Sequence, residues 1–271
     1  MILFLYLVIR NPDLFNSANQ SYINAFLSPP KVKPMQLHNA NAYRSASELE
    51  IMEQTLPMTD LNVLELGCGR AWMTRQMAER FHPAHITATE VDRIQHEKNL
   101  QIDDLPTVTF TYGGAEQIDL PDNSVDVAVM LKSLHHVPPE LMEKGLKEIA
   151  RVLKPGGLAY ISEPVYQGAF NDILKLFNDE KEVRELAFSA VKQAVENGTF
   201  ELQEQIFFNS PGHYADFTDF EARMLNVTHT EHKIDDALYQ QIRAAFEDHM
   251  TADGADFLKP SRVDLLRKPL A

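Results

Sequence analysis

The sequence predicts an α/β fold in which a mostly parallel, seven-stranded sheet is doubly wound and a helical cap is inserted late in the chain. Two observations predict it. Short apolar runs alternate with helical patterns between residues 45 and 163, which is typical of βαβ units around a parallel sheet. Residues 125–131 are apolar almost throughout, as expected for a strand that is buried on both faces.

The first predicted element is a helix over residues 45–56. Ser45 is its expected N-cap, Glu48 completes a capping box, and Pro57 ends the helix. Strands and helices then alternate along the chain. The strands are expected at 62–66, 85–90, 108–112, 125–131 and 158–162, and the helices at 71–81, 92–101 and 140–153.

The pattern changes after Glu163. Residues 170–197 are predicted to form one or two long helices, which end at an Asn-Gly pair. A strand at 227–234, a helix at 235–250 and a strand at 257–266 complete the sheet. We therefore expect an N-terminal extension over 1–44 and one domain over 45–271, with 164–225 as a lid.

Charge and composition narrow the class of protein. The chain has 271 residues, a net charge of −14 and one cysteine. Such an acidic surface repels phosphate backbones, so we expect no nucleic-acid partner. The single cysteine excludes an internal disulfide and a multi-cysteine metal site, and it indicates a reducing, cytoplasmic location.

Residues 1–10 are apolar apart from Arg10. A helix needs about 20 apolar residues to span a bilayer, and a signal peptide would begin with a basic region. We therefore expect no stable membrane insertion. A buried terminal segment, a partner contact such as a homodimer interface, and an upstream start codon all stay open as explanations of this run.

The segment V-L-E-L-G-C-G-R-A at residues 63–71 is the main candidate for a ligand site. Gly67, Gly69 and the small Ala71 follow a predicted strand at two-residue spacing, and glycines at such a turn let a ligand approach the main chain. The turn lies at the carboxyl end of that strand, which is where open α/β sheets bind their ligands.

Two acids indicate the kind of ligand. Glu65 stands just before the glycines, and a carboxylate there suits an amine-bearing ligand and repels a phosphate. The glycine spacing also differs from the G-x-G-x-x-G turn that binds pyrophosphate. Glu90 ends the next strand, with Asp92 close by, and a carboxylate at that position accepts the ribose hydroxyls of an adenosine ligand.

With a strand, E-x-G-x-G-x-A, a helix, a strand and an acid in this order, the sequence resembles the class I S-adenosylmethionine-dependent methyltransferases, which have a Rossmann-like fold. It is most similar to their small-molecule subgroup, which includes the ubiquinone/menaquinone-biosynthesis C-methyltransferases. The resemblance covers roughly residues 45–165. Three further segments carry it: G-G-A-E-Q-I-D-L-P-D-N-S-V-D (113–126), L-K-S-L-H-H-V (131–137) and R-V-L-K-P-G-G-L (151–158).

The resemblance implies S-adenosylmethionine as the cofactor, S-adenosylhomocysteine as the product, and in-line methyl transfer to a small-molecule acceptor. The cofactor-binding residues that it implies are Glu65, Gly67, Cys68, Gly69, Glu90, Val91, Gly114, Ala115, Glu116, Lys132 and His136. Gly114 departs from the family, which usually has an acid here that meets the adenine amino group. Adenine recognition then passes to main-chain groups of Ala115 and Glu116, or to the Glu116 side chain.

A base is needed if the acceptor is a phenol, an amine or a carbon acid. His135, Glu163 and His213 are the catalytic candidates. We expect His135 and His136 to point to opposite sides of an extended segment, and we expect no metal, because no third ligand stands at a recognisable spacing. The lid aromatics either line an acceptor pocket or pack the lid; with Leu174 they are Phe170, Phe177, Phe188, Phe207 and Phe208.

The segment 131–137 also bears on the acceptor. Methyltransferases that act on amino groups of DNA bases usually carry an Asn/Asp-Pro-Pro-aromatic motif there, and this chain has none. Two alternatives to a methyltransferase stay open. A non-catalytic binding protein would bind the cofactor without turnover, and a nicotinamide-dependent oxidoreductase would bind a dinucleotide, although Glu65 and the glycine spacing argue against the latter.

Overall fold

The computed structural model describes residues 34–39, 41–226 and 233–270. The strands in this part are β1 (Arg44–Ser45), β2 (Asn62–Leu66), β3 (His85–Glu90), β4 (Val108–Tyr112), β5 (Val125–Leu131), β6 (Leu153–Pro164), β7 (Glu201–Tyr214) and β8 (Ala255–Arg267). The helices are α3 (Glu48–Thr55), α4 (Trp72–Phe81), α5 (Arg93–Asn99), α6 (Pro139–Val152), α7 (Ala169–Leu174), α8 (Lys181–Glu196), α9 (Phe217–Met224) and α10 (Asp236–Glu247), with the short 3-10 helix η2 (Leu134–His136). The apolar run 1–10 lies outside the described residues.

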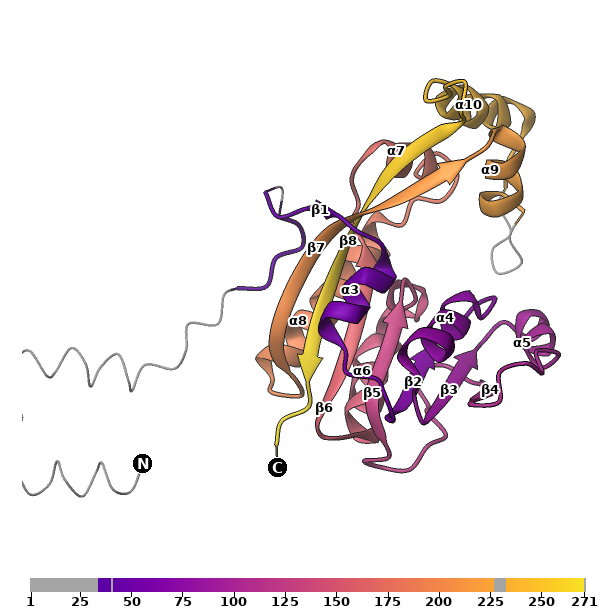
Figure 1. Ribbon diagram of the computed structural model, residues 1–271. Coiled ribbons are helices and arrows are strands. Elements are labelled where there is room, and N and C mark those ends of the chain that lie inside the picture. The colour runs from indigo at the N-terminus through magenta and orange to yellow at the C-terminus, as the bar shows by residue number, and fades with distance from the viewer. Residues whose placement is uncertain (1–33, 40, 227–232, 271) are drawn as a thin grey trace, which may run out of the picture. The chain divides into compact units, whose positions relative to one another are not determined.

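The sheet has the order β1-β7-β8-β6-β5-β2-β3-β4 (Figure 1). Only β8 runs against its neighbours, which are β6 and β7, and the other described pairings are parallel. The predicted mostly parallel sheet is therefore confirmed, with one more strand than the predicted seven, because the two-residue β1 pairs with the edge of β7.

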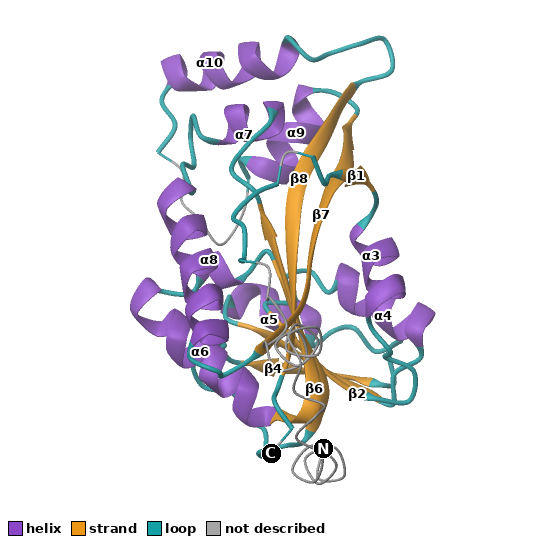
Figure 2. Cartoon of the chain, turned by 90° about the vertical axis from the view of Figure 1, so that its left-hand side faces the viewer, coloured by secondary structure: helices purple, strands orange, loops and turns teal. Residues whose placement is uncertain are grey.

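Helices cover both faces of the sheet, as Figure 2 shows for α6 and α8 on one side and α3 and α4 on the other. Met142, Leu146 and Ile149 of α6 share one core cluster with residues of α8. The opposite cluster contains Ile51 of α3 and Met77 of α4. This is the doubly wound arrangement that the sequence predicts.

The N-cap of the helix α3 lies two residues later in the chain than predicted. Ser47, not Ser45, is the N-cap, and its hydroxyl accepts the N–H of Glu50 while the Glu50 carboxylate accepts the N–H of Ser47. The sequence S-A-S-E-L-E offers two capping boxes in register. Ser45 pairs with Asn209 in the sheet instead, so strand pairing decides between them.

The carboxyl-terminal third differs most from the predicted elements. β7 was not predicted as a strand. Of the strand that we predicted at 227–234, residues 227–232 lie outside the described residues, and 233–234 are not in a strand. β7 and β8 form a long antiparallel pair, which Figure 1 shows extending from the sheet to α7, α9 and α10. We call these three helices the cap.

The cap has an aromatic core of its own. Its buried residues are Phe170, Ile173, Tyr214, Phe217, Phe220, Ile242, Phe246, Ala255 and Phe257. Of the region 164–225 that we predicted as a lid, α8 packs against α6 in the main core, whereas α10 lies beyond that region and packs in the cap. Within the described ranges, no helix combines the length and the apolar character that crossing a membrane requires.

Candidate active site

The glycine turn follows β2 and is shaped by its own backbone. Gly67 has a φ of 76° and Gly69 has a φ of 53°. Residues that carry a side chain rarely adopt this left-handed region. A Cβ on Gly67 would also lie 2.8 Å from the Cβ of Ser133. The Ser133 hydroxyl donates to the carbonyl of Leu66 over 2.9 Å, so the segment that follows β5 closes one side of the turn.

Glu90 connects this turn to the tip of β3. One of its carboxylate oxygens accepts the N–H of Gly69 over 2.7 Å. The other accepts the N–H groups of Val91 and Asp92, each over 2.8 Å. The acid predicted to hold a ribose therefore also fixes the glycine turn in place.

A cavity of about 800 Å³ opens over the carboxyl ends of β2, β3 and β5. We call it the larger cavity. Its lining includes nine of the predicted cofactor-binding residues, which are Gly67, Gly69, Glu90, Val91, Gly114, Ala115, Glu116, Lys132 and His136. Glu65 and Cys68 do not line it.

Glu65 and Cys68 are buried behind the turn. The Thr74 hydroxyl donates to the Glu65 carboxylate over 2.5 Å. Burial raises the pKa of Glu65 to about 7, opposed by the Thr74 hydrogen bond and reinforced by the charge of Glu90. Burial, with the charges of Glu65 and Glu90, also raises the pKa of the Cys68 thiol, so Cys68 is a packing residue and not a nucleophile.

Gly114 leaves room that Glu116 occupies. A Cβ on Gly114 would overlap both carboxylate oxygens of Glu116. The family usually carries an acid at position 114. In this chain the carboxylate of Glu116, two residues later, occupies the corresponding space. Of the two alternatives for adenine recognition, this geometry favours the Glu116 side chain.

A second cavity of about 300 Å³, which we call the smaller cavity, lies between the sheet and the cap. It shares Lys132, His136 and Arg223 with the larger cavity. One wall is apolar and comes from the segment around α7, with Phe170, Leu174 and Phe177. Of the other predicted lid aromatics, Phe208 is buried in the main core, and the ring of Phe188 stacks on Arg262.

His135 lies at the wall of the smaller cavity and is held by Glu163. The Nδ1 atom of His135 is 2.5 Å from one oxygen of Glu163, and the other oxygen accepts the N–H of Leu134 over 2.9 Å. Burial by itself would raise the pKa of the Glu163 carboxyl. The charges of His135 and Arg262 and the hydrogen bonds from His135 and Leu134 outweigh burial, so the pKa is lowered overall. This dyad orients the imidazole with its Nε2 atom free of Glu163.

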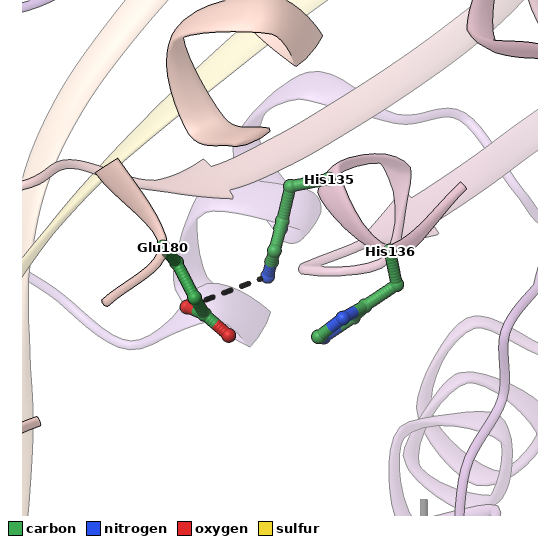
Figure 3. A group of neighbouring side chains, drawn as sticks. All are labelled: His135, His136 and Glu180. Atoms are coloured by element: carbon green, nitrogen blue, oxygen red, sulfur yellow. Dashed lines mark ion pairs between the residues drawn. The ribbon is translucent and has the colours of Figure 1, made fainter. Parts of the chain in front are cut away.

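Figure 3 shows His135 and His136 side by side with Glu180. The prediction that the two histidines point apart is wrong, because they lie in the helical turn η2 and not in an extended segment; their ring centroids are 4.1 Å apart. The nearest ligand atoms of the three residues lie within 4.8 Å of one another.

The three side chains of Figure 3 have the ligand types of a divalent metal site. However, the Nε and Nη2 atoms of Arg184 both donate to one oxygen of Glu180. That guanidinium already compensates the carboxylate charge and would repel a divalent cation. We therefore interpret the group as an ion-pair network.

The structure separates His213 from the other catalytic candidates. Its Nδ1 atom pairs with Asp256 over 2.9 Å at an exposed position, and it lines neither cavity. The next residue, Tyr214, does line the smaller cavity. The sequence reasoning missed Arg223 and Lys259, which reach the smaller cavity from α9 and β8 and carry no local signal.

Comparisons with known proteins find methyltransferases among the relatives of part of this chain. Residues 63–157 match the family described as a methyltransferase domain. An uncharacterised methyltransferase of Mycobacterium bovis is 34% identical over 108 residues, which is 40% of this chain and 42% of that protein. The sterol 24-C-methyltransferase of Yarrowia lipolytica is 32% identical over 41% of this chain and 30% of its own. The 2-methyl-6-phytyl-1,4-hydroquinone methyltransferase 2 of rice is 31% identical over 45% and 36%, respectively.

Solved structures extend the similarity of fold beyond that segment. The YcgJ protein of Bacillus subtilis superposes with a TM-score of 0.56 at 16% identity, over 82% of this chain and 97% of its own. The cyclase SpnF superposes with a TM-score of 0.53 at 20% identity, over 94% and 96%. Residues 63–157 thus match a methyltransferase-domain family, and most of the chain shares its fold with these solved structures. It spans less than half the length of the curated relatives that it matches.

Proposed function

We propose that the protein transfers a methyl group from S-adenosylmethionine to a small-molecule acceptor. The observation that carries this proposal is the pair of adjoining cavities. The larger one lies over the glycine turn and the acid of β3, and the smaller one, closed by the cap, shares Lys132, His136 and Arg223 with it. A cofactor in the first cavity and an acceptor in the second would meet at these shared residues.

The residues of the larger cavity fit this cofactor. Glu90 offers a carboxylate to ribose hydroxyls at the tip of β3, and Glu116 fills the space beside Gly114 where the family has its adenine-binding acid. The main chain of Gly67 and Gly69 is open to the methionine part. When bound, S-adenosylmethionine supplies an electrophilic methyl group, so the protein's own work is to position, desolvate and, where needed, deprotonate the acceptor.

The smaller cavity supports an acceptor with an apolar body. Its wall of Phe170, Leu174 and Phe177 is apolar, and two of the relatives are named for methylating a sterol and a phytyl hydroquinone. With a net charge of −14 the chain does not suit a nucleic-acid acceptor.

We assign the proton-accepting role to His135 and a positioning role to Glu163. The imidazole lines the smaller cavity, and Glu163 fixes its orientation through Nδ1. Nε2 is then the atom that faces an acceptor, 3.7 Å from Glu180. An acceptor hydroxyl that lost its proton to Nε2 would become a better nucleophile.

Because the cyclase SpnF shares this fold, fold alone does not establish methyl transfer, and the test must follow the methyl group. The protein is incubated with S-adenosylmethionine that carries an isotope-labelled methyl group and with a panel of apolar small molecules. We expect labelled acceptor and S-adenosylhomocysteine in equal amounts. Bound cofactor with no label in any acceptor would instead support the non-catalytic alternative.

Glu163→Gln tests the dyad in the same assay. We expect a loss of roughly 100-fold in turnover, with cofactor binding unchanged, because Glu163 lines neither cavity. The loss should shrink at high pH, where an acidic acceptor ionises without a base. A purely structural role for Glu163 would give a loss that does not depend on pH.

A further inference from the structure

The smaller cavity is cationic in a chain that is otherwise acidic. Lys132, Arg223 and Lys259 all line it, although the net charge of the chain is −14. Arg223 pairs with Asp219 over 3.1 Å. In the described ranges, the amines of Lys132 and Lys259 form no ion pair. Among the described residues that line the cavity, Glu180 is the one with a carboxylate, and it is bound by Arg184.

The Lys259 amine is held in a built position. It lies 4.7 Å from the ring centroid of Phe170 and 5.4 Å from that of Tyr214, so its charge is stabilised by aromatic faces. Gly212 on β7 leaves the space for it, because a Cβ there would lie 2.4 Å from both Cε and Nζ of Lys259.

The same surroundings make this charge costly while no anion is near. Burial, together with the charges of Lys132 and Arg223, lowers the pKa of Lys259 to about 8. An anionic group between these cations would relieve their repulsion and supply the missing counter-charge. A half-buried cation that lines a cavity and has no ion-pair partner is typical of a ligand-binding position.

We propose that Lys259, with Arg223, binds an anionic group on the acceptor, so that the acceptor is an apolar acid. Its oxyanion would lie at Lys259 and its apolar body against Phe170 and Leu174. The methionine carboxylate of the cofactor is the competing anion, because Lys132 and Arg223 also line the larger cavity. Lys259 lines only the smaller of the two cavities. A substitution of Lys259 therefore distinguishes binding of the acceptor's anion from binding of the cofactor's carboxylate. This inference depends on the proposed function in one respect, which is that the smaller cavity is taken to bind the acceptor.

The test uses two fluorescent probes with one ring skeleton. 1-Anilinonaphthalene-8-sulfonate carries a permanent anion, and N-phenyl-1-naphthylamine lacks it. Both are titrated at pH 7 into full-length protein saturated with S-adenosylhomocysteine, which blocks the larger cavity. We expect Lys259→Met to weaken binding of the sulfonate roughly tenfold, about 1.4 kcal/mol, and to leave the neutral probe nearly unchanged.

Two further variants complete the experiment. Lys192→Met removes an exposed lysine of α8 that pairs with Glu196, and it should change neither probe. Gly212→Ala keeps the lysine but displaces its amine, and it should weaken the sulfonate alone. This variant also serves as the test if Lys259→Met does not fold.

The outcomes are distinguishable. Equal sulfonate affinity in the wild type, Lys259→Met and Gly212→Ala would overturn the inference. So would a roughly tenfold loss of S-adenosylhomocysteine affinity in Lys259→Met, which would assign the lysine to the cofactor. If the wild type fails to bind S-adenosylhomocysteine, the proposed function fails, whereas the preference for the sulfonate still reports on Lys259.

Discussion

At the scale of single residues, the buried Glu65 makes the stability of the folded chain depend on pH. Its carboxyl is buried behind the turn, and its pKa is raised from 4.5 to about 7. The folded state therefore holds a proton that the unfolded state has lost between these two values. This contribution to stability is full below about pH 4.5 and is lost as the pH rises through about 7.

We predict that Glu65→Gln removes this dependence. Relative to the wild type, the variant should gain stability on the order of 3 kcal/mol between pH 5 and pH 8, measured as the free energy of unfolding in urea without cofactor. Glu97→Gln, an exposed change on α5, is the control and should follow the wild type. Parallel pH profiles for Glu65→Gln and the wild type would contradict the raised pKa.

Site residues could be predicted from the sequence where neighbours in the chain are neighbours in space. The glycine turn and Glu90 belong to one strand-turn-helix-strand unit, and their local pattern was sufficient. Lys259 and Arg223 reach the site through the pairing of β7 with β8 and through the cap, so nothing near them in the sequence marks them. His135 and His136 were misjudged because a 3-10 turn has a different side-chain period from a strand.

At the scale of elements, the strands and helices between residues 62 and 164 match the predicted ones to within a few residues, except that β6 begins at Leu153 and not at 158. Buried parallel strands of this kind are apolar runs between glycines, and the helices between them are amphipathic, so each carries its own signal. β7 carries no such signal. Its sequence E-L-Q-E-Q-I-F-F-N-S-P-G-H-Y is mostly polar and contains Pro-Gly, and its long pairing with β8 makes it a strand.

The choice between two capping boxes is the sharpest test at this scale. Ser47→Ala should destabilise the protein by about 1 kcal/mol, because it removes the acceptor for the N–H of Glu50 at the start of α3. Ser45→Ala is the matched control and should change little, since the Ser45 side chain is exposed and outside the helix. Thermal or urea unfolding of the two variants measures these losses of stability and shows which serine caps the helix. Equal losses would contradict the assigned cap.

At the scale of the whole molecule, the two cavities belong to different parts of the chain. The larger one is lined almost entirely by residues of the segment 63–157, to which the family match is confined. The smaller one is lined mainly by residues 164–261, from α7, α8, α9, β7, β8 and the segments between them. The comparisons therefore bear on the half for which we propose cofactor binding, and the proposed acceptor is inferred from the chemistry of the other half.

The central claim is that the larger cavity holds S-adenosylmethionine with Glu90 at its ribose, and calorimetric titration with S-adenosylhomocysteine tests it most directly. We predict micromolar binding by the wild type and by the control Glu97→Gln, and affinity lower by roughly tenfold, about 1.4 kcal/mol, in Glu90→Ala. Glu90→Gln keeps acceptor oxygen for the N–H of Gly69 and should fall between them. No binding by the wild type, or equal binding by all four proteins, would contradict the account.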